Sequence, residues 1–152
     1  MARVAVITGA SRGIGAATAL VLAERGHGVV VNRRAVHPQR VVATIAMVGG
    51  EAMAIKADVT VPNDVTAMVD EIDQRWGGMH VHSALTSVAV TLFAELSWDQ
   101  LGGKLDSELH AAFLTTNAVV LGMVRRYGRL IYLSTGLSRH SREHMIRLRT
   151  GD

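Results

Sequence analysis

The sequence predicts an α/β fold in which a doubly wound parallel sheet carries helices on both faces. Short apolar runs typical of buried strands alternate with stretches of helical periodicity along the chain. A glycine-rich turn at residues 8–15 joins the first apolar run to the first helical stretch. The composition, 49% hydrophobic and 19% charged over 152 residues, suits one domain with a sizeable core.

Five apolar runs are expected to form the strands of this sheet. They are rich in valine, isoleucine and alanine, and glycine, asparagine or aspartate stands at or near most of their ends. The predicted strands are residues 4–7, 28–32, 52–59, 79–84 and 129–133.

Two shorter helices are expected between these strands, and each ends at a pair of glycines. The first covers residues 38–48, and the second opens at Pro62 and runs to Trp76. Apolar residues of the second helix recur at helical spacing, so they are predicted to be core: Val65, Met68, Val69, Ile72 and Trp76.

A long helix is predicted to begin after Ser97 and to run towards Arg126. Ser97 and Gln100 have the spacing of a capping box, in which each side chain bonds to the other residue's backbone N–H. Apolar residues recur at every fourth position of this helix and are expected to form its buried edge: Leu101, Leu105, Leu109 and Phe113.

The turn at residues 8–15 has the spacing of a nucleotide-binding loop. Glycines let the backbone reverse sharply and approach a pyrophosphate closely. The phosphate charge then lies against the unpaired N–H groups and the positive dipole end of the following helix. An ordinary tight turn is the alternative, but a preceding strand and a following helix favour the dinucleotide interpretation. The predicted coenzyme contacts of this turn are Thr8, Gly9, Ser11, Arg12, Gly13, Ile14 and Gly15.

The end of the second strand indicates which coenzyme is preferred. An acidic residue there would bind the ribose 2′-hydroxyl of NAD, whereas arginine accommodates the 2′-phosphate of NADP. The chain has Asn32-Arg33-Arg34 at this place and no acid. A guanidinium group matches phosphate oxygens in charge and geometry, so NADP(H) is predicted, although both arginines could be merely exposed.

These motifs resemble the short-chain dehydrogenase/reductase family, in particular its 3-oxoacyl carrier-protein reductases. The resemblance rests on Thr-Gly-x-x-x-Gly-x-Gly at 8–15 and on the ends of the second and third strands, Val-Asn-Arg at 31–33 and Ala-Asp-Val at 57–59. It also rests on Leu-Gly-Met at 121–123, Gly-Arg-Leu-Ile at 128–131 and the Ser-Thr at 134–135 that ends the fifth strand. It implies a Rossmann-like sheet with the strand order 3-2-1-4-5 and hydride transfer between NADPH and a carbonyl. It also implies further coenzyme contacts at Asp58, Val59, Ser83 and Ala84.

The resemblance places the family's catalytic groups on residues that mostly cannot perform their roles. Ser134 and Thr135 match the hydroxyl position, and Thr135 fits the register better. Glu108 stands where the family has an asparagine, while Leu148 and Asp152 stand at the Tyr-x-x-x-Lys pair. Leucine has no proton to give, and aspartate reverses the charge that would depress the pKa of a tyrosine. Negligible turnover is therefore expected.

The resemblance also implies that the single domain, residues 1–152, stops after five strands and ends in an irregular basic tail at 135–152. An exposed apolar fifth strand would then invite pairing with another copy, through this strand and the long helix. Residues 125–152 hold seven arginines against two acids, a net +5, in a chain of net charge +3. A solvated segment is favoured over nucleic-acid binding for this tail.

Other chemistries find little support in the sequence. Residues 140–144 spell H-x-x-E-H, but without an evident third ligand, so no metal is expected. The absence of cysteine excludes disulfides and thiolate catalysis. No apolar run approaches the about 18 residues of a membrane span, and no signal peptide is evident, so a cytoplasmic protein is expected.

Three interpretations remain open: an NADP-binding reductase by descent without turnover, a non-catalytic nucleotide-binding or oligomerisation module, and a nucleic-acid-binding protein.

Overall fold

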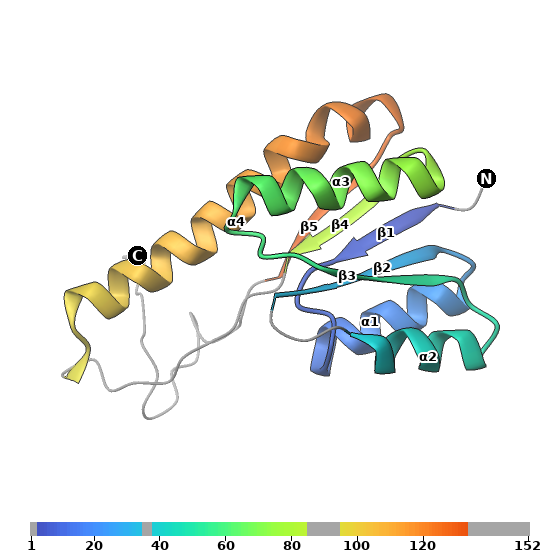
Figure 1. Cartoon of the computed structure of the whole chain (residues 1–152), viewed down its shortest axis with the longest axis horizontal. Coiled ribbons are helices and arrows are strands. Elements are labelled where there is room, and N and C mark those ends of the chain that lie inside the picture. The colour runs from blue at the N-terminus through green and yellow to red at the C-terminus, as the bar shows by residue number, and fades with distance from the viewer. Residues whose placement is uncertain (1–2, 35–37, 85–94, 134–152) are drawn as a thin grey trace, which may run out of the picture.

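The computed structural model describes residues 3–34, 38–84 and 95–133, which form one parallel sheet covered by helices on both faces (Figure 1). In chain order the elements are β1 (Val4–Ile7), α1 (Gly13–Glu24), β2 (Gly28–Arg33), α2 (Gln39–Met47), β3 (Ala52–Lys56), α3 (Pro62–Trp76), β4 (Val81–Ala84), α4 (Trp98–Arg125) and β5 (Arg129–Tyr132).

The strand order is β3-β2-β1-β4-β5, and every neighbouring pair is parallel, which confirms the predicted topology. The chain moves outward from β1 to β3 and then returns to the other side of β1 for β4 and β5. The helices α1 and α2 lie on one face and α3 and α4 on the other (Figure 1). The reversal between β1 and β4 creates the crevice at the carboxyl ends of the strands where doubly wound folds bind ligands.

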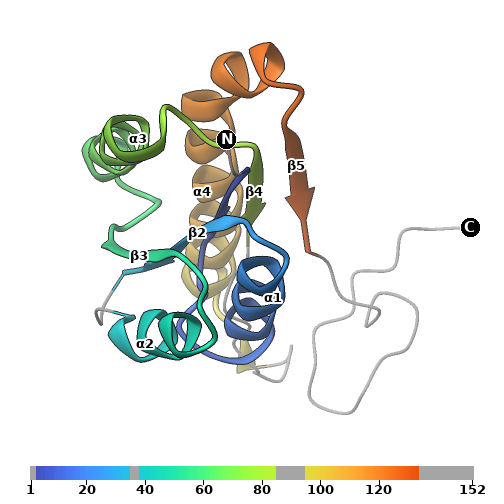
Figure 2. The ribbon, with the colours of Figure 1, turned by 90° about the vertical axis from the view of Figure 1, so that its right-hand side faces the viewer.

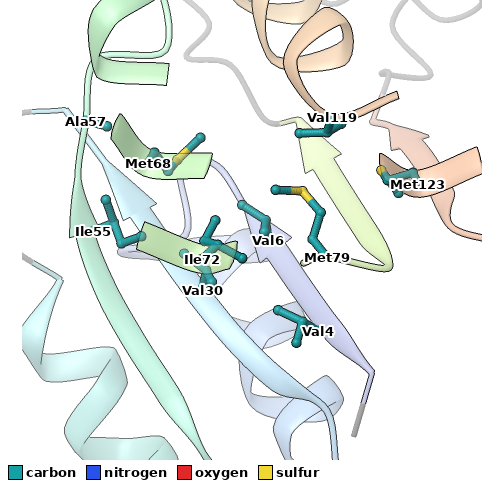
Figure 3. Close-up of a cluster of buried hydrophobic side chains, with 10 residues drawn as sticks. All are labelled: Val4, Val6, Val30, Ile55, Ala57, Met68, Ile72, Met79, Val119 and Met123. Carbon is teal, nitrogen blue, oxygen red and sulfur yellow. The ribbon is translucent and has the colours of Figure 1, made fainter. Parts of the chain in front are cut away.

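The core between the sheet and the helices α3 and α4 joins buried residues of β1, β2 and β3 to residues of both helices (Figure 3). Ile72 of α3 is fully buried over Val6 of β1 and Val30 of β2. The predicted stripe of α3 is confirmed, since Val65, Met68 and Ile72 are buried, and Val69 and Trp76 pack against the cluster. This cluster consists of Val4, Val6, Val30, Ile55, Ala57, Met68, Ile72, Met79, Val119 and Met123.

The opposite face of the sheet packs on α1 and α2 through smaller side chains. Alternate residues of β1 and β2 point to this side, as the period of two along a strand requires. The cluster contains Ile7, Ala10, Ala19, Ala23, Val29, Val31 and Ile45. Both faces of the central strands are therefore dry, which explains their continuous apolar sequences.

The prediction for the buried edge of α4 was wrong. Leu109 and Phe113 are 68% and 63% exposed, Leu105 is also exposed, and Leu101 is only half-buried. The face that packs on the sheet carries Ala111, Thr115, Val119 and Met123. Small side chains at 111 and 115 let the helix approach the sheet closely, and Thr115 satisfies its buried hydroxyl by donating to the carbonyl of Ala111 at 2.7 Å.

The strand β5 forms one margin of the sheet (Figure 2). It pairs with β4, and within the described residues no strand lies on its other side. Ile131 and Tyr132 are 44% and 52% exposed, so an apolar margin is present as predicted. Among the helices of the described ranges, none is long and apolar enough to cross a membrane.

Candidate functional site

The glycine turn joins β1 to α1 at the carboxyl edge of the sheet. Gly9 and Gly13 have φ angles of +67° and +55°, in the left-handed region that glycine tolerates best. The N–H of Ala10 donates to the carbonyl of Asn32 at 3.2 Å, which fixes the turn against the end of β2. The turn that leads from β1 into α1 is therefore held in place by the end of β2.

The amino terminus of α1 is suited to an anion. Its N-cap residue, Arg12, makes no side-chain capping bond, and no acidic residue lies in the first turn of the helix. By contrast, α4 begins with a complete capping box, in which Ser97 accepts from the N–H of Gln100 at 3.2 Å. Because the helix dipole favours negative charge at its start, an uncapped helix behind a glycine turn can hold a phosphate.

A cavity of about 570 Å³ opens directly above this turn. Its walls come from the turn, the end of β2, the segment after β3 and the first half of α4. The lining residues are Thr8, Gly9, Ser11, Arg12, Gly13, Ile14, Gly15, Asn32, Arg33, Arg34, Ala57, Asp58, Val59, Thr60, Lys104, Ser107, Glu108 and Ala111. The structure thus brings together every predicted coenzyme contact up to Val59.

Two arginines at the end of β2 line the cavity. Arg33 donates from Nη1 to the hydroxyl of Ser11 at 2.8 Å, so the last residue of β2 is tied to the glycine turn. Arg34 lies 3.8 Å from the carboxylate of Asp58, and its side chain is 73% exposed. Neither guanidinium is buried in the core, and both line the cavity.

Asp58 is held as a carboxylate by its neighbours. Burial disfavours its charged form, but hydrogen bonds from the side chain and N–H of Thr60, together with nearby Arg34, outweigh that effect and hold the pKa of Asp58 below its usual value. Thr60 donates from Oγ1 at 2.7 Å and from N at 3.0 Å. This turn begins directly after β3, which is why the strand ends at Lys56 and not at residue 59 as predicted.

Asn32 lines the cavity but uses its amide group inside the sheet. Its side chain is buried, and Nδ2 donates to the carbonyls of Ile55 and Ala57 at 3.3 and 3.1 Å. It therefore locks the end of β2 to the end of β3. This places the two arginines that follow it at a fixed position on the cavity rim.

The wall formed by α4 was largely missed in the sequence. Lys104, Ser107, Glu108 and Ala111 all line the cavity, whereas only Glu108 was singled out from the sequence. Lys104 and Glu108 form an ion pair at 2.5 Å. The i,i+4 spacing of their opposite charges is the signal that could have revealed the pair.

The remaining predicted residues belong to β4 or lie outside the described ranges. Ser83 and Ala84 belong to β4, where Ser83 pairs with Ile7 of β1 and Ala84 with Tyr132 of β5. The catalytic positions Ser134, Thr135, Leu148 and Asp152, and the histidine motif at 140–144, lie beyond residue 133 and are not described. Among the residues that are described, no group of three histidine or acidic side chains could hold a metal ion.

Neither of the chain's two tyrosines lines the cavity. Tyr127 is 95% exposed, and the hydroxyl of Tyr132 is hydrogen-bonded to that of Thr116 on the other side of α4. The cavity therefore offers an anion site and two charged groups on α4. No tyrosine that could serve as a proton donor faces it within residues 3–133.

Comparison with known proteins identifies the same features. The family model described as short chain dehydrogenase matches residues 3–147. The chain is 37% identical over 136 residues to the 1-cyclohexenylcarbonyl-CoA reductase of Streptomyces collinus, covering 88% of this chain and 48% of that protein. It is 35% identical over 140 residues to a 3-oxoacyl-[acyl-carrier-protein] reductase of Synechocystis, covering 88% and 56%. The chain thus spans about half the length of the curated relatives it matches.

Solved structures of the same family superpose closely on the chain. A short-chain type dehydrogenase/reductase from Mycobacterium marinum is 32% identical with a TM-score of 0.84, and the match covers 93% of this chain and 57% of that one. A metagenomic short-chain oxidoreductase solved in complex with NADP is 29% identical with a TM-score of 0.79, covering 88% and 62%. The glycine turn, the strand order and these matches agree, and the chain belongs to the short-chain dehydrogenase family.

Proposed function

We propose that the chain binds NADP(H), as the coenzyme-binding part of an oxidoreductase of the carbonyl or 3-oxoacyl reductase class. The observation that carries this proposal is the placement of Arg33 and Arg34 at the end of β2, beside the glycine turn and above an uncapped helix. A guanidinium that lines the cavity favours a 2′-phosphate, and no acidic residue stands at the end of β2 to repel one. A structural relative bound to NADP supports the same assignment.

The residues of the cavity divide the binding task between them. Backbone N–H groups of the turn and of α1 would receive the pyrophosphate. Arg33, oriented by Ser11, would receive the 2′-phosphate in charge-assisted hydrogen bonds. The ionised carboxylate of Asp58 is an acceptor suited to an amino group of the adenine. When bound, NADPH would supply a hydride, and these residues would bind and orient the coenzyme.

We further propose that the 152-residue polypeptide does not itself reduce carbonyls. Proton transfer to the carbonyl oxygen needs an acid near the coenzyme, and Leu148 and Asp152 stand where the family places tyrosine and lysine. Glu108 lines the cavity in place of the family's asparagine, and an ionised carboxylate cannot donate a hydrogen bond. Of the catalytic set, only the hydroxyl position, at Thr135 or Ser134, would be retained.

A second function, self-association, is favoured by one specific observation. The outer side of α4 exposes Leu109, Phe113, Leu121 and Val124, and a groove of about 410 Å³ lies between this helix and Tyr132 of β5. Exposed apolar area of this kind is typical of an interface. We propose that two copies associate through the long helix and the fifth strand.

Calorimetric titration with NADP⁺, NADPH, NAD⁺ and NADH tests the main proposal. NADP⁺ is expected to bind at least about ten-fold more tightly than NAD⁺, and NADPH more tightly than NADH by a similar factor. The reason is that charge-assisted hydrogen bonds to the 2′-phosphate contribute about 1.5–3 kcal/mol each. Adenosine 2′,5′-bisphosphate against 5′-AMP isolates the 2′-phosphate. Equal affinity for the two members of each pair, or no binding heat, would overturn the proposal. A carbonyl-reduction assay with NADPH then tests the expected lack of turnover.

A further inference from the structure

The face of α4 that packs in the core continues beyond the sheet as the wall of the cavity. Ala111 and Thr115 share this face with Val119 and Met123, and one turn or more before them it carries Lys104, Ser107 and Glu108. Figure 1 shows the first half of α4 projecting past the carboxyl ends of the strands. The Lys104–Glu108 pair therefore sits at a place fixed by the packing of the helix.

The pair and the two arginines belong to different walls of the cavity, one formed by α4 and the other by the end of β2. Arg33 ends β2, which neighbours β1 on one side, whereas β4 neighbours β1 on the other. The second half of α4 packs over β1 and over the segment just before β4, since Val119 and Met123 share a cluster with Val6 and Met79. A dinucleotide with its pyrophosphate at the turn and its 2′-phosphate at Arg33 must direct its other nucleoside towards β4 and α4.

That other nucleoside carries the nicotinamide ring, whose charge depends on oxidation state. The ring bears one positive charge in NADP⁺ and none in NADPH, while the rest of the two coenzymes is identical. A fixed charge near this end of the cavity must therefore change the ratio of their affinities. Lys104 and Glu108 are only 31% and 36% exposed, so solvent screens them incompletely.

We propose that Glu108 and Lys104 together set the preference of this chain between oxidised and reduced coenzyme. The carboxylate of Glu108 favours the cationic ring of NADP⁺, and the ammonium of Lys104, 2.5 Å away, offsets that preference. Because the two charges offset each other, both NADP⁺ and NADPH can bind beside them. This inference rests on the proposed binding of NADP(H).

Two opposite substitutions test the pair by binding alone. Glu108→Gln leaves Lys104 unopposed, so the ratio of the dissociation constants for NADP⁺ and NADPH is expected to rise about three- to ten-fold. Lys104→Gln leaves Glu108 unopposed, so the same ratio is expected to fall by a similar factor. A general loss of folded protein or of affinity weakens the binding of both coenzymes equally and leaves the ratio of their dissociation constants unchanged. A change in this ratio therefore reports the effect of the charge.

Matched controls change the same charge elsewhere on α4. Asp106→Asn removes a negative charge from an exposed residue next to this wall but outside the cavity lining, and Arg125→Gln removes a positive charge at the far end of the helix. Both are expected to leave the ratio within about two-fold of the unaltered chain, because exposed charges are strongly screened. The ratios are obtained by calorimetry, with tryptophan fluorescence as a second signal.

The outcomes separate this inference from the proposed function. If both coenzymes bind and neither Glu108→Gln nor Lys104→Gln moves the ratio beyond the controls, the inference is wrong and NADP(H) binding stands. If both variants move the ratio in the same direction, the inference is also wrong, because opposite charges must act oppositely. If the unaltered chain binds neither coenzyme, both proposals are overturned.

Discussion

Arg33 donates a hydrogen bond to the hydroxyl of Ser11 across 2.8 Å, and this contact joins the end of β2 to the glycine turn. The two residues lie 22 positions apart in the chain and meet at the rim of the cavity. A guanidinium anchored in this way has lost part of its rotamer freedom before any phosphate arrives, which lowers the entropic cost of binding.

Replacing Arg33 with glutamine is expected to weaken NADP⁺ binding about ten- to hundred-fold, since charge-assisted hydrogen bonds contribute about 1.5–3 kcal/mol. NAD⁺ binding should change little, because NAD⁺ has no 2′-phosphate. Ser11→Ala should have a smaller effect, of a few-fold, since the charge stays and only its anchor is lost. Arg75→Gln is the control, because Arg75 pairs with Glu51 outside the cavity. Equal losses of NADP⁺ and NAD⁺ affinity in Arg33→Gln would refute this role.

Two glycine substitutions are expected to change stability in opposite directions. Gly13 has a φ of +55° and open space around it, so alanine there meets no clash but must adopt a left-handed backbone, at a cost of about 1–2 kcal/mol. Gly102 lies inside α4, also in open space, so alanine there should stabilise the fold by about 0.5–1 kcal/mol. Urea unfolding of both variants measures the difference. A Gly13→Ala variant as stable as Gly102→Ala would contradict the backbone assignment.

Stability is expected to fall in mild acid because of His80. Its Nδ1 accepts a hydrogen bond from the N–H of Val4 at 3.2 Å, and burial, followed by the charges of Arg126, Arg3 and His27, lowers the pKa of His80 from its ordinary 6.5. The unfolded chain therefore takes up this proton at a higher pH than the folded one. The contribution of His80 is fully present above about pH 6.5 and is lost as the pH falls below that value.

The variant His80→Asn isolates this effect. Its side-chain oxygen can still accept from Val4, but it takes up no proton in this range. The free energy of unfolding of the variant should depend less on pH between about 6.5 and 5 than that of the unaltered chain. His110→Asn, at an exposed position on α4, serves as the control. Parallel pH profiles for the unaltered chain and His80→Asn would show that His80 does not carry the effect.

Charges placed on the outer face of α4 should weaken self-association. Phe113→Glu combined with Val124→Glu puts two carboxylates on the exposed apolar side of the helix. Phe113 is 63% exposed and Val124 is 70% exposed. The dissociation constant measured by sedimentation is expected to rise about ten-fold or more, because losing a buried aromatic contact costs about 2 kcal/mol. Met47→Glu on α2, at the opposite face of the sheet, should leave association unchanged. A monomeric unaltered chain would remove the basis for this interface.

The strands and the residues that line the cavity beside the glycine turn could be predicted because their signals are local in the sequence. Apolar runs mark the central strands, which are covered on both faces, and the glycine spacing marks the turn at 8–15. Arg33 and Arg34 follow directly from the end of a strand. Each of these inferences needed only residues close together along the chain.

The packing of α4 could not be predicted in the same way. The stripe of Leu105, Leu109 and Phe113 and the stripe of Thr115, Val119 and Met123 have the same helical spacing, so periodicity alone does not say which one faces the sheet. The sequence favours the larger residues, while the structure buries the face with small residues because they permit close approach. The same rotation of α4 brings Lys104 into the cavity, which is why this residue was missed.

The buried amide of Asn32 limits which residues at the end of β2 can be exchanged without loss of stability. An aspartate at this position would place a carboxylate oxygen against the two carbonyl oxygens that now accept from Nδ2. Repulsion between these oxygens would destabilise the pairing of the ends of β2 and β3. If the chain binds NADP(H) as proposed, substitutions that move its preference towards NAD are therefore expected at 33 and 34, whose side chains line the cavity, and not at residue 32.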